Sequence, residues 1–428
     1  MLTLLLDLTR TWETPQRQAL ALACALRRAG RFAPLICCPA DAPLARRARE
    51  ADLPVLPLSG TSPRNPLSLF RLWNRQRRQR ILLVHTFGGD APLLGWFVRR
   101  MRAPGRTILL HSRFTPHALE DNFRSRVWQE ADKILCGTSF IAARLRDGGL
   151  DPAVLPVIRP GLRQEEYPPR RPRGDGRFAF VTTGALTEPA GHSVLVKAMA
   201  ALWQRTDLPP WEVRIVGEGP LFRDILEEAR ALGVESRLAL LGAQREGDVL
   251  PLCDALVTPF TGPQGAPRTL AAGWLTGLPV ICTTSPVHLE LARPDDTVLT
   301  VAPGDPQELA SAMIRLMLDR QRYDSLTLRG LSMASRVTEE HMAQRCLELY
   351  ADGIARRGCA GGRRPHIRKR RMTLRHALPV ARITFATRRN ALFPPAGETV
   401  GQQSRGIVLR DMTGGVSSDK THFSPKDS

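Results

Sequence analysis

The chain has 428 residues and a mass of 47.4 kDa, which predicts two domains and an appendage rather than a single core. Its content of 43% hydrophobic and 24% charged residues excludes disorder over most of the chain. The formal net charge is +20, and residues 353–428 alone hold sixteen Arg and Lys against four Asp and Glu. The longest charge-free stretch, residues 269–289, is broken by glycines and prolines, so we expect no membrane span.

The cysteines and the N-terminus bear on location. The eight cysteines include no Cys-x-x-Cys pair and no neighbouring histidine cluster, which predicts reduced thiols and no zinc site. Residues 1–7 lack a basic lead and have too short an apolar run for a signal peptide. We therefore expect a cytoplasmic protein whose first residues form a strand.

The first half of the chain alternates apolar runs with helical patterns, as in a parallel sheet that is buried on both faces. A helix is predicted over Gln16–Arg28 and stops at Gly30. The predicted strands are Leu2–Leu6, Pro34–Cys38, Ile81–His85, Thr107–His111, Lys133–Cys136 and Val154–Ile158. These elements predict a first domain over residues 1–165, followed by a linker rich in Pro, Gly and Arg over residues 166–177.

The alternation restarts after the linker and predicts a second domain over residues 178–336. Its predicted strands are Phe178–Thr183, Val213–Val216, Leu238–Leu241, Ala255–Thr258 and Leu278–Cys282, and its helices are His192–Gln204, Leu221–Leu232 and Pro306–Leu318. A helix over residues 337–357 and a basic, disordered tail over residues 358–428 complete the chain. The fold class is α/β, with two doubly wound, Rossmann-like domains whose strand ends face a cleft.

A glycine-rich turn is the first motif with a chemical meaning. Gly217-Glu218-Gly219-Pro220 joins a strand to a helix, where glycines let the backbone approach a ligand and the helix N-terminus favours anions. The turn lacks the third glycine of a dinucleotide fingerprint, which argues against a Rossmann dehydrogenase. Taken alone, it also fits an ordinary strand-to-helix turn.

The order and spacing of five motifs make the pattern specific. They are Gly184 with Gly191-His192, then Val216–Pro220, Leu240–Gly242, Asp254–Pro259 and Gly277–Ile281. This series resembles the donor domain of family-4 glycosyltransferases, which have the GT-B fold. Residues 136–145 and 337–357 resemble the family's Ser-led helix and the final helix that crosses back onto the first domain. The resemblance covers residues 1–357 and implies retaining, metal-independent transfer of a hexosyl group from a nucleotide sugar.

The resemblance also implies the acceptor and the site residues. The acceptor is a cell-envelope glycan or a lipid-linked sugar, and no cofactor is expected besides the donor substrate, a nucleoside-diphosphate sugar. The donor-binding positions are Gly184, Gly217, Glu218, Gly219, Gly242, Gly265, Pro267 and Glu290, and the catalytic ones are His111 and Gln264. Arg268, beside Pro267 at a predicted helix start, joins the catalytic set as the nearest replacement cation.

Several of these residues keep two interpretations. His111 lies on the acceptor side or only packs at a strand end, whereas His85 is expected to pack. Arg268 is a substitute cation for the diphosphate or a solvated arginine at a helix start. Glu290 contacts the sugar or ribose, or caps a helix.

Several ligand-facing positions depart from the family pattern. Ala185 and Ala190 replace the Arg and Lys that hold the diphosphate, and Gln264 and Ala272 replace two glutamates. Losing both cations predicts a loss on the order of 10²–10⁴ in rate. The alternative is therefore a catalytically degenerate GT-B protein that acts as a binding or scaffold partner of an active transferase.

The basic tail leaves three interpretations. It is solvated disorder, or residues 358–390 adhere to anionic phospholipid, which places the protein peripherally at the inner face of the cell membrane. Nucleic-acid binding ranks last, because no recognisable module surrounds Phe385 and Phe393.

Overall fold

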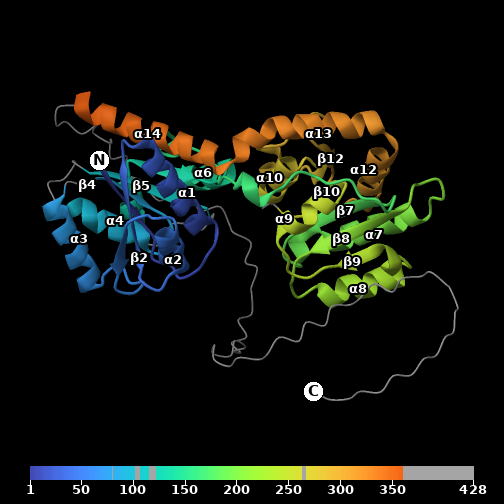
Figure 1. Cartoon of the computed structure of the whole chain (residues 1–428), viewed down its shortest axis with the longest axis horizontal. Coiled ribbons are helices and arrows are strands. Elements are labelled where there is room, and N and C mark those ends of the chain that lie inside the picture. The colour runs from blue at the N-terminus through green and yellow to red at the C-terminus, as the bar shows by residue number, and fades with distance from the viewer. Residues whose placement is uncertain (80, 102–106, 115–121, 263–266, 360–428) are drawn as a thin grey trace, which may run out of the picture. The chain divides into compact units, whose positions relative to one another are not determined.

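The computed structural model describes residues 1–359 except 80, 102–106, 115–121 and 263–266. These residues form two lobes, each built on a six-stranded sheet (Figure 1). The first lobe contains strands β1–β6 and the second contains strands β7–β12. Every described strand pair is parallel, which confirms the predicted α/β class. The predicted basic tail lies outside the described residues, apart from its first two positions.

The first sheet has the strand order β3-β2-β1-β4-β5-β6. Its strands are β1 (Leu2–Leu6), β2 (Ala33–Pro39), β3 (Val55–Leu58), β4 (Ile81–Thr86), β5 (Ile108–Arg113) and β6 (Lys133–Cys136). The strand predicted over Val154–Ile158 is wrong. Only Val157 pairs there, as an isolated bridge to Cys136, because Pro156 has no amide hydrogen for a ladder.

Helices cover both faces of the first sheet. They are α1 (Thr14–Ala29), α2 (Pro43–Glu50), α3 (Pro66–Arg78), α4 (Ala91–Arg100), α5 (Asn122–Gln129) and α6 (Ser139–Asp147). One core packs α1 and α2 on the sheet, and a separate core packs α3 and α4 on the other face. The predicted stop of α1 is confirmed, since Gly30 has the left-handed φ of 69° that favours glycine.

The second sheet has the order β12-β11-β10-β7-β8-β9. Its strands are β7 (Phe178–Thr183), β8 (Trp211–Val216), β9 (Leu238–Leu240), β10 (Ala255–Thr258), β11 (Val280–Thr283) and β12 (Leu299–Val301). Strand β12 was not predicted from the sequence.

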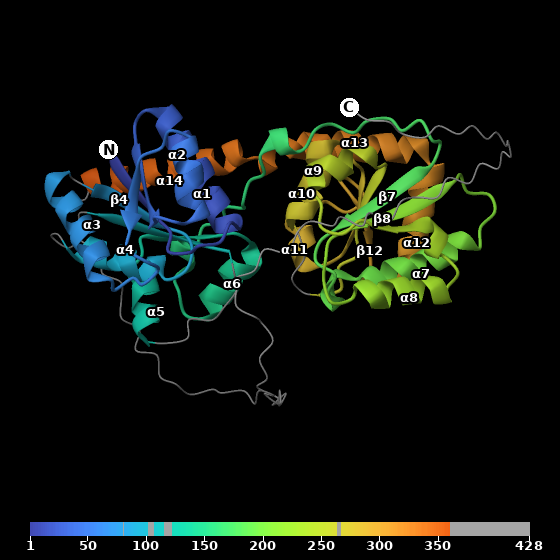
Figure 2. The same cartoon turned by 60° about the horizontal axis from the view of Figure 1, so that its bottom comes forward.

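Seven described helices follow in the second lobe, and one more returns to the first. They are α7 (His192–Trp203), α8 (Phe222–Ala231), α9 (Glu246–Val249), α10 (Pro267–Thr276), α11 (Pro286–Leu289), α12 (Pro306–Leu318), α13 (Arg320–Ala334) and α14 (Glu339–Cys359). Figure 2 shows α14 lying along α1, and Met342, Cys346 and Tyr350 of α14 belong to the core of the first lobe. Within the described part of the chain, we find no helix with the length and apolar content of a membrane span.

Candidate functional site

Three predicted glycines meet at the carboxyl edge of the second sheet. Gly184 follows β7, Gly217 follows β8, and Gly242 lies two residues after β9. The amide of Gly184 donates to the carbonyl of Val216 at 3.0 Å, and the amide of Gly217 donates to the carbonyl of Gly242 at 2.8 Å. A Cβ at position 217 would lie 1.8 Å from the carbonyl oxygen of Gly184, and φ there is +153°. Only glycine therefore allows this close approach of two turns.

The turn after Gly184 is held by the neighbouring turn. The amide of Leu186 donates to the carbonyl of Glu218 at 2.9 Å, while the Glu218 side chain is exposed. A Cβ at Gly219 would lie 2.5 Å from the carbonyl oxygen of Leu186. Ala185 is exposed on this turn. The predicted positions 184, 217, 218 and 219 thus form one backbone surface. Beside it lies the exposed Ala185, where the family resemblance expects an arginine.

The charged residues at this edge form a network around Glu246, at the start of α9. Its Oε1 accepts a hydrogen bond from Thr183 Oγ1 at 2.9 Å, and its Oε2 accepts one from Tyr167 Oη at 2.9 Å. Arg268 Nη1 lies 2.6 Å from the same Oε2, and Arg268 Nη2 donates to Tyr167 Oη at 2.7 Å. Burial alone would lower the pKa of Arg268, but the negative charge of Glu246 raises it above its ordinary value. Arg268 is therefore a paired cation, although its side chain is 44% exposed.

Glu290 directly follows α11 and contacts the first lobe. Its Oε2 accepts a hydrogen bond from the amide of Ser139 at 3.0 Å, and its Oε1 accepts one from the amide of Phe140 at 3.0 Å. These are the first amides of α6, so the carboxylate caps that helix. Arg159 Nη2 lies 3.4 Å from Oε2. Of the two roles that the sequence left open, these contacts support the cap.

Both predicted strand-end histidines are fully buried in the first lobe. His111 Nδ1 lies 2.7 Å from Thr86 Oγ1. His85 Nδ1 lies 2.7 Å from Tyr350 Oη, and its Nε2 lies 2.8 Å from Ser112 Oγ. Burial lowers the pKa of each ring to about 3, so both are neutral at pH 7. These surroundings support a packing role for both histidines.

The remaining predicted positions lie in α10 or just before it in the sequence. Gln264 and Gly265 lie outside the described residues, and Pro267 is the first residue of α10. Ala272 is fully buried in the core between α10 and the sheet. The methyl side chain of Ala272 fits that core, so packing alone explains an alanine at this position, without any ligand.

A buried carboxylate that was not predicted lies at the equivalent edge of the first sheet. Asp7, which directly follows β1, is fully buried. Its Oδ2 accepts hydrogen bonds from Gln16 Nε2 at 2.7 Å and the amide of Gly88 at 2.9 Å, and its Oδ1 accepts two from Thr9. Gln16 Oε1 in turn accepts from the amide of Glu13 at 3.0 Å, which closes a capping box. The sequence did contain a sign of this carboxylate, because an acidic residue directly follows the apolar run Leu2–Leu6.

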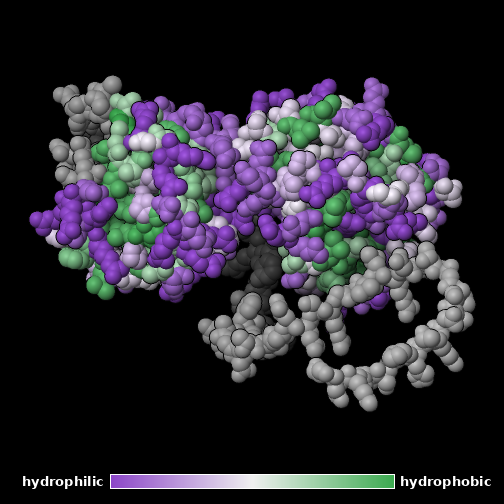
Figure 3. Space-filling model, viewed as in Figure 1, coloured by the Kyte–Doolittle hydropathy of each residue, from purple (hydrophilic) through white to green (hydrophobic). Residues whose placement is uncertain are grey.

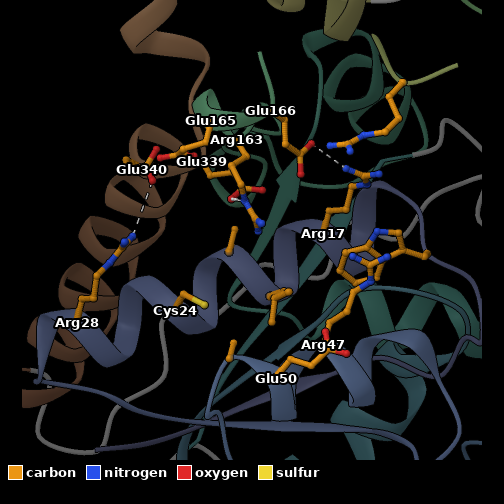
Figure 4. A pocket seen from close by; sticks show the side chains of 15 residues that line it. Arg17, Cys24, Arg28, Arg47, Glu50, Arg163, Glu165, Glu166, Glu339 and Glu340 are labelled. Carbon is orange, nitrogen blue, oxygen red and sulfur yellow. Dashed lines mark hydrogen bonds and ion pairs between the residues drawn. The ribbon is translucent and has the colours of Figure 1, made fainter. Parts of the chain in front are cut away.

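A charged groove of about 800 Å³ runs along α1 and was not predicted (Figure 4). Ion pairs cross it: Arg17 with Glu166 at 3.3 Å, and Arg28 with Glu340 at 3.9 Å. Ten of its lining residues are charged, namely Arg17, Arg28, Arg47, Arg163, Arg245, Glu50, Glu165, Glu166, Glu339 and Glu340. The guanidinium of Arg47 stacks on the ring of Trp12 at 4.2 Å. The groove is therefore lined by five arginines, which donate hydrogen bonds, and by five glutamates, which accept them.

Metal chemistry needs a cluster of ligands. Among the residues that the structure describes, no group of three or more His, Cys, Asp and Glu side chains could hold a metal ion. The described cysteines are free thiols. The polar groups that we find at the two described sheet edges are backbone amides, hydroxyls and paired charges.

Two family models match the chain, one in each lobe. A model described as Glycosyltransferase Family 4 matches residues 15–166, and a model described as Glycosyl transferases group 1 matches residues 177–319. Together they cover well over half of the chain. A curated exopolysaccharide phosphotransferase of Streptomyces coelicolor is 26% identical over 155 residues. That match covers 35% of this chain and 16% of the relative, so the chain spans less than a fifth of the relative's length.

Solved structures match both lobes. Anabaena HepE, solved in complex with UDP, is 17% identical, with a TM-score of 0.67 over 82% of this chain and 100% of that chain. A glycosyltransferase from Rickettsia africae is 16% identical, with a TM-score of 0.69 over 82% of this chain and 98% of that chain. These likenesses show that the fold is the GT-B fold expected from the sequence. By its two domain matches and its fold, the chain belongs to the family-4-like glycosyltransferases.

Proposed function

We propose that this protein transfers a hexosyl group, with retention and without a metal, from a nucleoside-diphosphate sugar to a cell-envelope glycan or lipid-linked acceptor. The observation that carries the proposal is the convergence of Gly184, Gly217 and Gly242 at one sheet edge. Open α/β sheets bind ligands at this edge, and turns without side chains admit a nucleotide to the backbone. UDP is our first choice of nucleotide, because HepE was solved with UDP.

The donor phosphates would lie against the start of α10. A helix N-terminus presents free amides and a partial positive charge to an anion, and α10 begins at Pro267. Arg268, in its first turn, supplies the nearest cation but shares its charge with Glu246. Phosphate binding therefore depends on backbone amides more than on side-chain charge.

The groove along α1 supports a glycan as the acceptor. Five arginines and five glutamates line it together with the apolar Leu20 and Ala21 (Figure 4). Sugar hydroxyls donate and accept hydrogen bonds, so they match a wall that contains both kinds of group. The protein would work at the inner face of the cell membrane, where lipid-linked acceptors present their sugars to the cytoplasm.

A second candidate function is that of a binding or scaffold partner without turnover. Its support is the pairing of charges at the predicted donor site. Glu246 neutralises Arg268, and the Glu290 carboxylate is used by the amides of α6. Ala185 and Ala190 carry no charge, and Arg268 is already paired with Glu246. A leaving diphosphate would therefore meet no unpaired cation at these three positions.

One experiment tests both candidates. The full chain is titrated calorimetrically with UDP-, GDP- and ADP-sugars. Slow hydrolysis of each bound donor, in which water takes the sugar and the free nucleotide leaves, is then followed over time. The transferase proposal expects saturable binding of one donor and slow release of its nucleotide. Binding without release favours the scaffold, and absence of binding to all donors contradicts the proposed donor site.

A matched pair of variants locates the binding. Ala185→Glu adds a negative charge to the exposed turn after β7, and should weaken donor binding at least tenfold by repelling the diphosphate. Ala355→Glu makes the same change at an exposed position of α14 and should leave binding unchanged. Equal effects of the two variants would contradict donor binding at the glycine turns.

A further inference from the structure

Helix α3 in the first lobe has one face packed and one face uncovered. Ser68, Leu72 and Gln76 recur every four residues and are buried against the lobe. The amide of Ser59 donates to Ser68 Oγ at 2.9 Å, which fixes the helix to the end of β3. Asn65 caps the N-terminus, since its side chain accepts from the amides of Leu67 and Ser68. The helix is therefore held rigidly, and its outer residues have defined directions.

Large apolar side chains occupy the outer side of α3. Leu67 is 60% exposed, Phe70 is 59% exposed and Trp73 is 38% exposed. They recur every three residues, so they share one side of the helix. The rings of Phe70 and Trp73 are 5.8 Å apart between centroids. Three large apolar residues together in water are costly for a free surface, which marks this side as a contact surface.

Arginines adjoin this apolar side. Arg71 and Arg78 are seven residues apart on a neighbouring side of α3 and are exposed, and the guanidinium of Arg77 lies 4.7 Å from the ring of Trp73. None of these three forms an ion pair within the described residues. The sequence from 53 to 89 contains no Asp or Glu at all. Figure 3 shows hydrophobic and hydrophilic surface side by side over the end of the first lobe that carries α3.

We infer that α3 docks this protein on an anionic lipid bilayer. Trp, Phe and Leu bury their apolar area at the boundary between headgroups and acyl chains, and arginines beside them contact lipid phosphates. A second copy fits this surface poorly, because a two-fold contact through α3 would bring two sets of arginines together, and residues 53–89 contain no Asp or Glu to offset them. The inference goes beyond donor chemistry and differs from membrane contact through the tail, because it needs apolar insertion as well as charge.

The test measures binding of the full chain to vesicles by co-sedimentation. Vesicles of phosphatidylglycerol with phosphatidylcholine supply the anionic surface, and pure phosphatidylcholine is the neutral comparison. The double variant Phe70→Ser, Trp73→Ser should lower binding to the anionic vesicles at least tenfold. The matched control Leu328→Ser, Leu331→Ser removes two exposed apolar side chains of α13 in the second lobe, and should leave vesicle binding unchanged.

The charge part of the surface has its own variant. Arg71→Gln with Arg78→Gln should weaken binding by roughly fivefold per arginine and flatten its dependence on salt. Because all of these side chains are exposed, each variant should melt at the wild-type temperature. That comparison ensures that any lost binding is not lost folding.

Four outcomes would overturn the inference. They are wild-type protein that ignores anionic vesicles, equal binding to neutral vesicles, vesicle binding that Phe70→Ser, Trp73→Ser leaves intact, and a concentration-dependent dimer that the same variant abolishes. Retained donor binding in the α3 variants is expected in every case. The inference and the proposed transferase activity can therefore fail independently.

Discussion

The two lobes share a fold but build their carboxyl sheet edges from different groups. In the first lobe, side chains close the edge: Asp7 binds Thr9, Gln16 and the amide of Gly88, and the two histidines are bonded to neighbouring side chains. In the second lobe, the turns at Gly184 and Gly217 meet through their backbones. At the first edge the Asp7 carboxylate is bonded to its own neighbours, although His111 Nε2 is buried without a partner among the described residues. At the second edge Gly184 and Gly242 leave open space where a side chain would stand.

This difference separates packing from binding within one architecture. A buried carboxylate whose oxygens all accept hydrogen bonds from its own lobe stabilises a loop and leaves few groups for a ligand. An edge of glycine turns contributes little side-chain stabilisation but allows close approach of a ligand. The second edge is therefore the stronger candidate for the donor site, and the first edge is the scaffold that orients α1. Five experiments test this contrast.

The largest effect is expected from Gly217→Val. The new Cβ would lie 1.8 Å from the Gly184 carbonyl, and valine disfavours the φ of +153°. We expect a loss of more than about 4 kcal/mol in unfolding free energy, measured by urea denaturation. The control is Gly242→Ala, which also has positive φ but meets no atom within 4 Å, and should cost only ~1 kcal/mol. Equal losses would mean that close backbone approach does not define this edge.

The first edge is broken by Asp7→Ala. The variant leaves the Gly88 amide and one hydrogen of Gln16 Nε2 without an acceptor, while Gln16 Nε2 keeps Thr9 Oγ1 at 2.7 Å. Each orphaned buried donor costs ~1–3 kcal/mol. We expect a loss of about 2–4 kcal/mol in urea unfolding, with donor affinity unchanged in the protein that remains folded. Asp7→Asn keeps an acceptor oxygen and should cost less. A specific loss of donor binding by Asp7→Asn would move the site to the first lobe.

The histidines of the first edge make its stability depend on pH. Burial lowers the pKa of His111 to about 3, whereas the unfolded chain takes up this proton near pH 6.5. Stability is therefore fully present above pH 6.5 and falls as the pH drops toward 3. Between pH 7 and pH 5 the cost is about 2 kcal/mol for this histidine.

A difference between variants isolates this contribution, because burial also lowers the pKa of His85, His192 and His288. His111→Gln should reduce the pH 7 to pH 5 loss in unfolding free energy by about 2 kcal/mol. His341→Gln, at an exposed position of α14, should leave that loss unchanged. An unchanged loss in His111→Gln would show that this ring is not held neutral by burial.

The second edge is sharpened by restoring charge. Ala185→Arg with Ala190→Lys places cations at the two positions where the family resemblance expects them. Binding of UDP or GDP should strengthen at least tenfold, which corresponds to about 1.4 kcal/mol of binding free energy. A single new hydrogen bond to a charged group supplies that much. Calorimetric titration measures the change, and Ala355→Arg on α14 is the matched control. Tight binding by the unmodified protein, unaffected by the two changes, would favour a phosphate site elsewhere.

The sequence predicted the sheets better than the pairings between distant residues. Apolar runs located β1, β7 and β10 closely, because buried parallel strands are continuous in sequence. The same rule failed at Val154–Ile158, where Pro156 interrupts an apolar run. The glycine turns were predicted because their spacing is local.

The charged contacts could not be predicted in the same way. Glu290 reaches Ser139 across 151 positions, and Glu246 reaches Thr183 across 63. The periodicity of a sequence cannot predict such contacts, because the order of the strands in the sheet decides which distant residues meet. The groove along α1 was missed for the same reason, since its walls come from segments far apart in the chain.

The smallest effect on stability is expected from removing the basic tail after Gly358. The tail shows no sustained apolar period in its sequence, so we expect it to contribute no core. The melting temperature of the truncated chain should equal that of the full chain. Its binding to anionic vesicles should weaken through lost charge, while Phe70→Ser, Trp73→Ser should weaken it further, because apolar insertion by α3 is a separate contribution. A large fall in melting temperature would place part of the tail in the folded body, and complete loss of vesicle binding on truncation would assign the membrane contact to the tail alone.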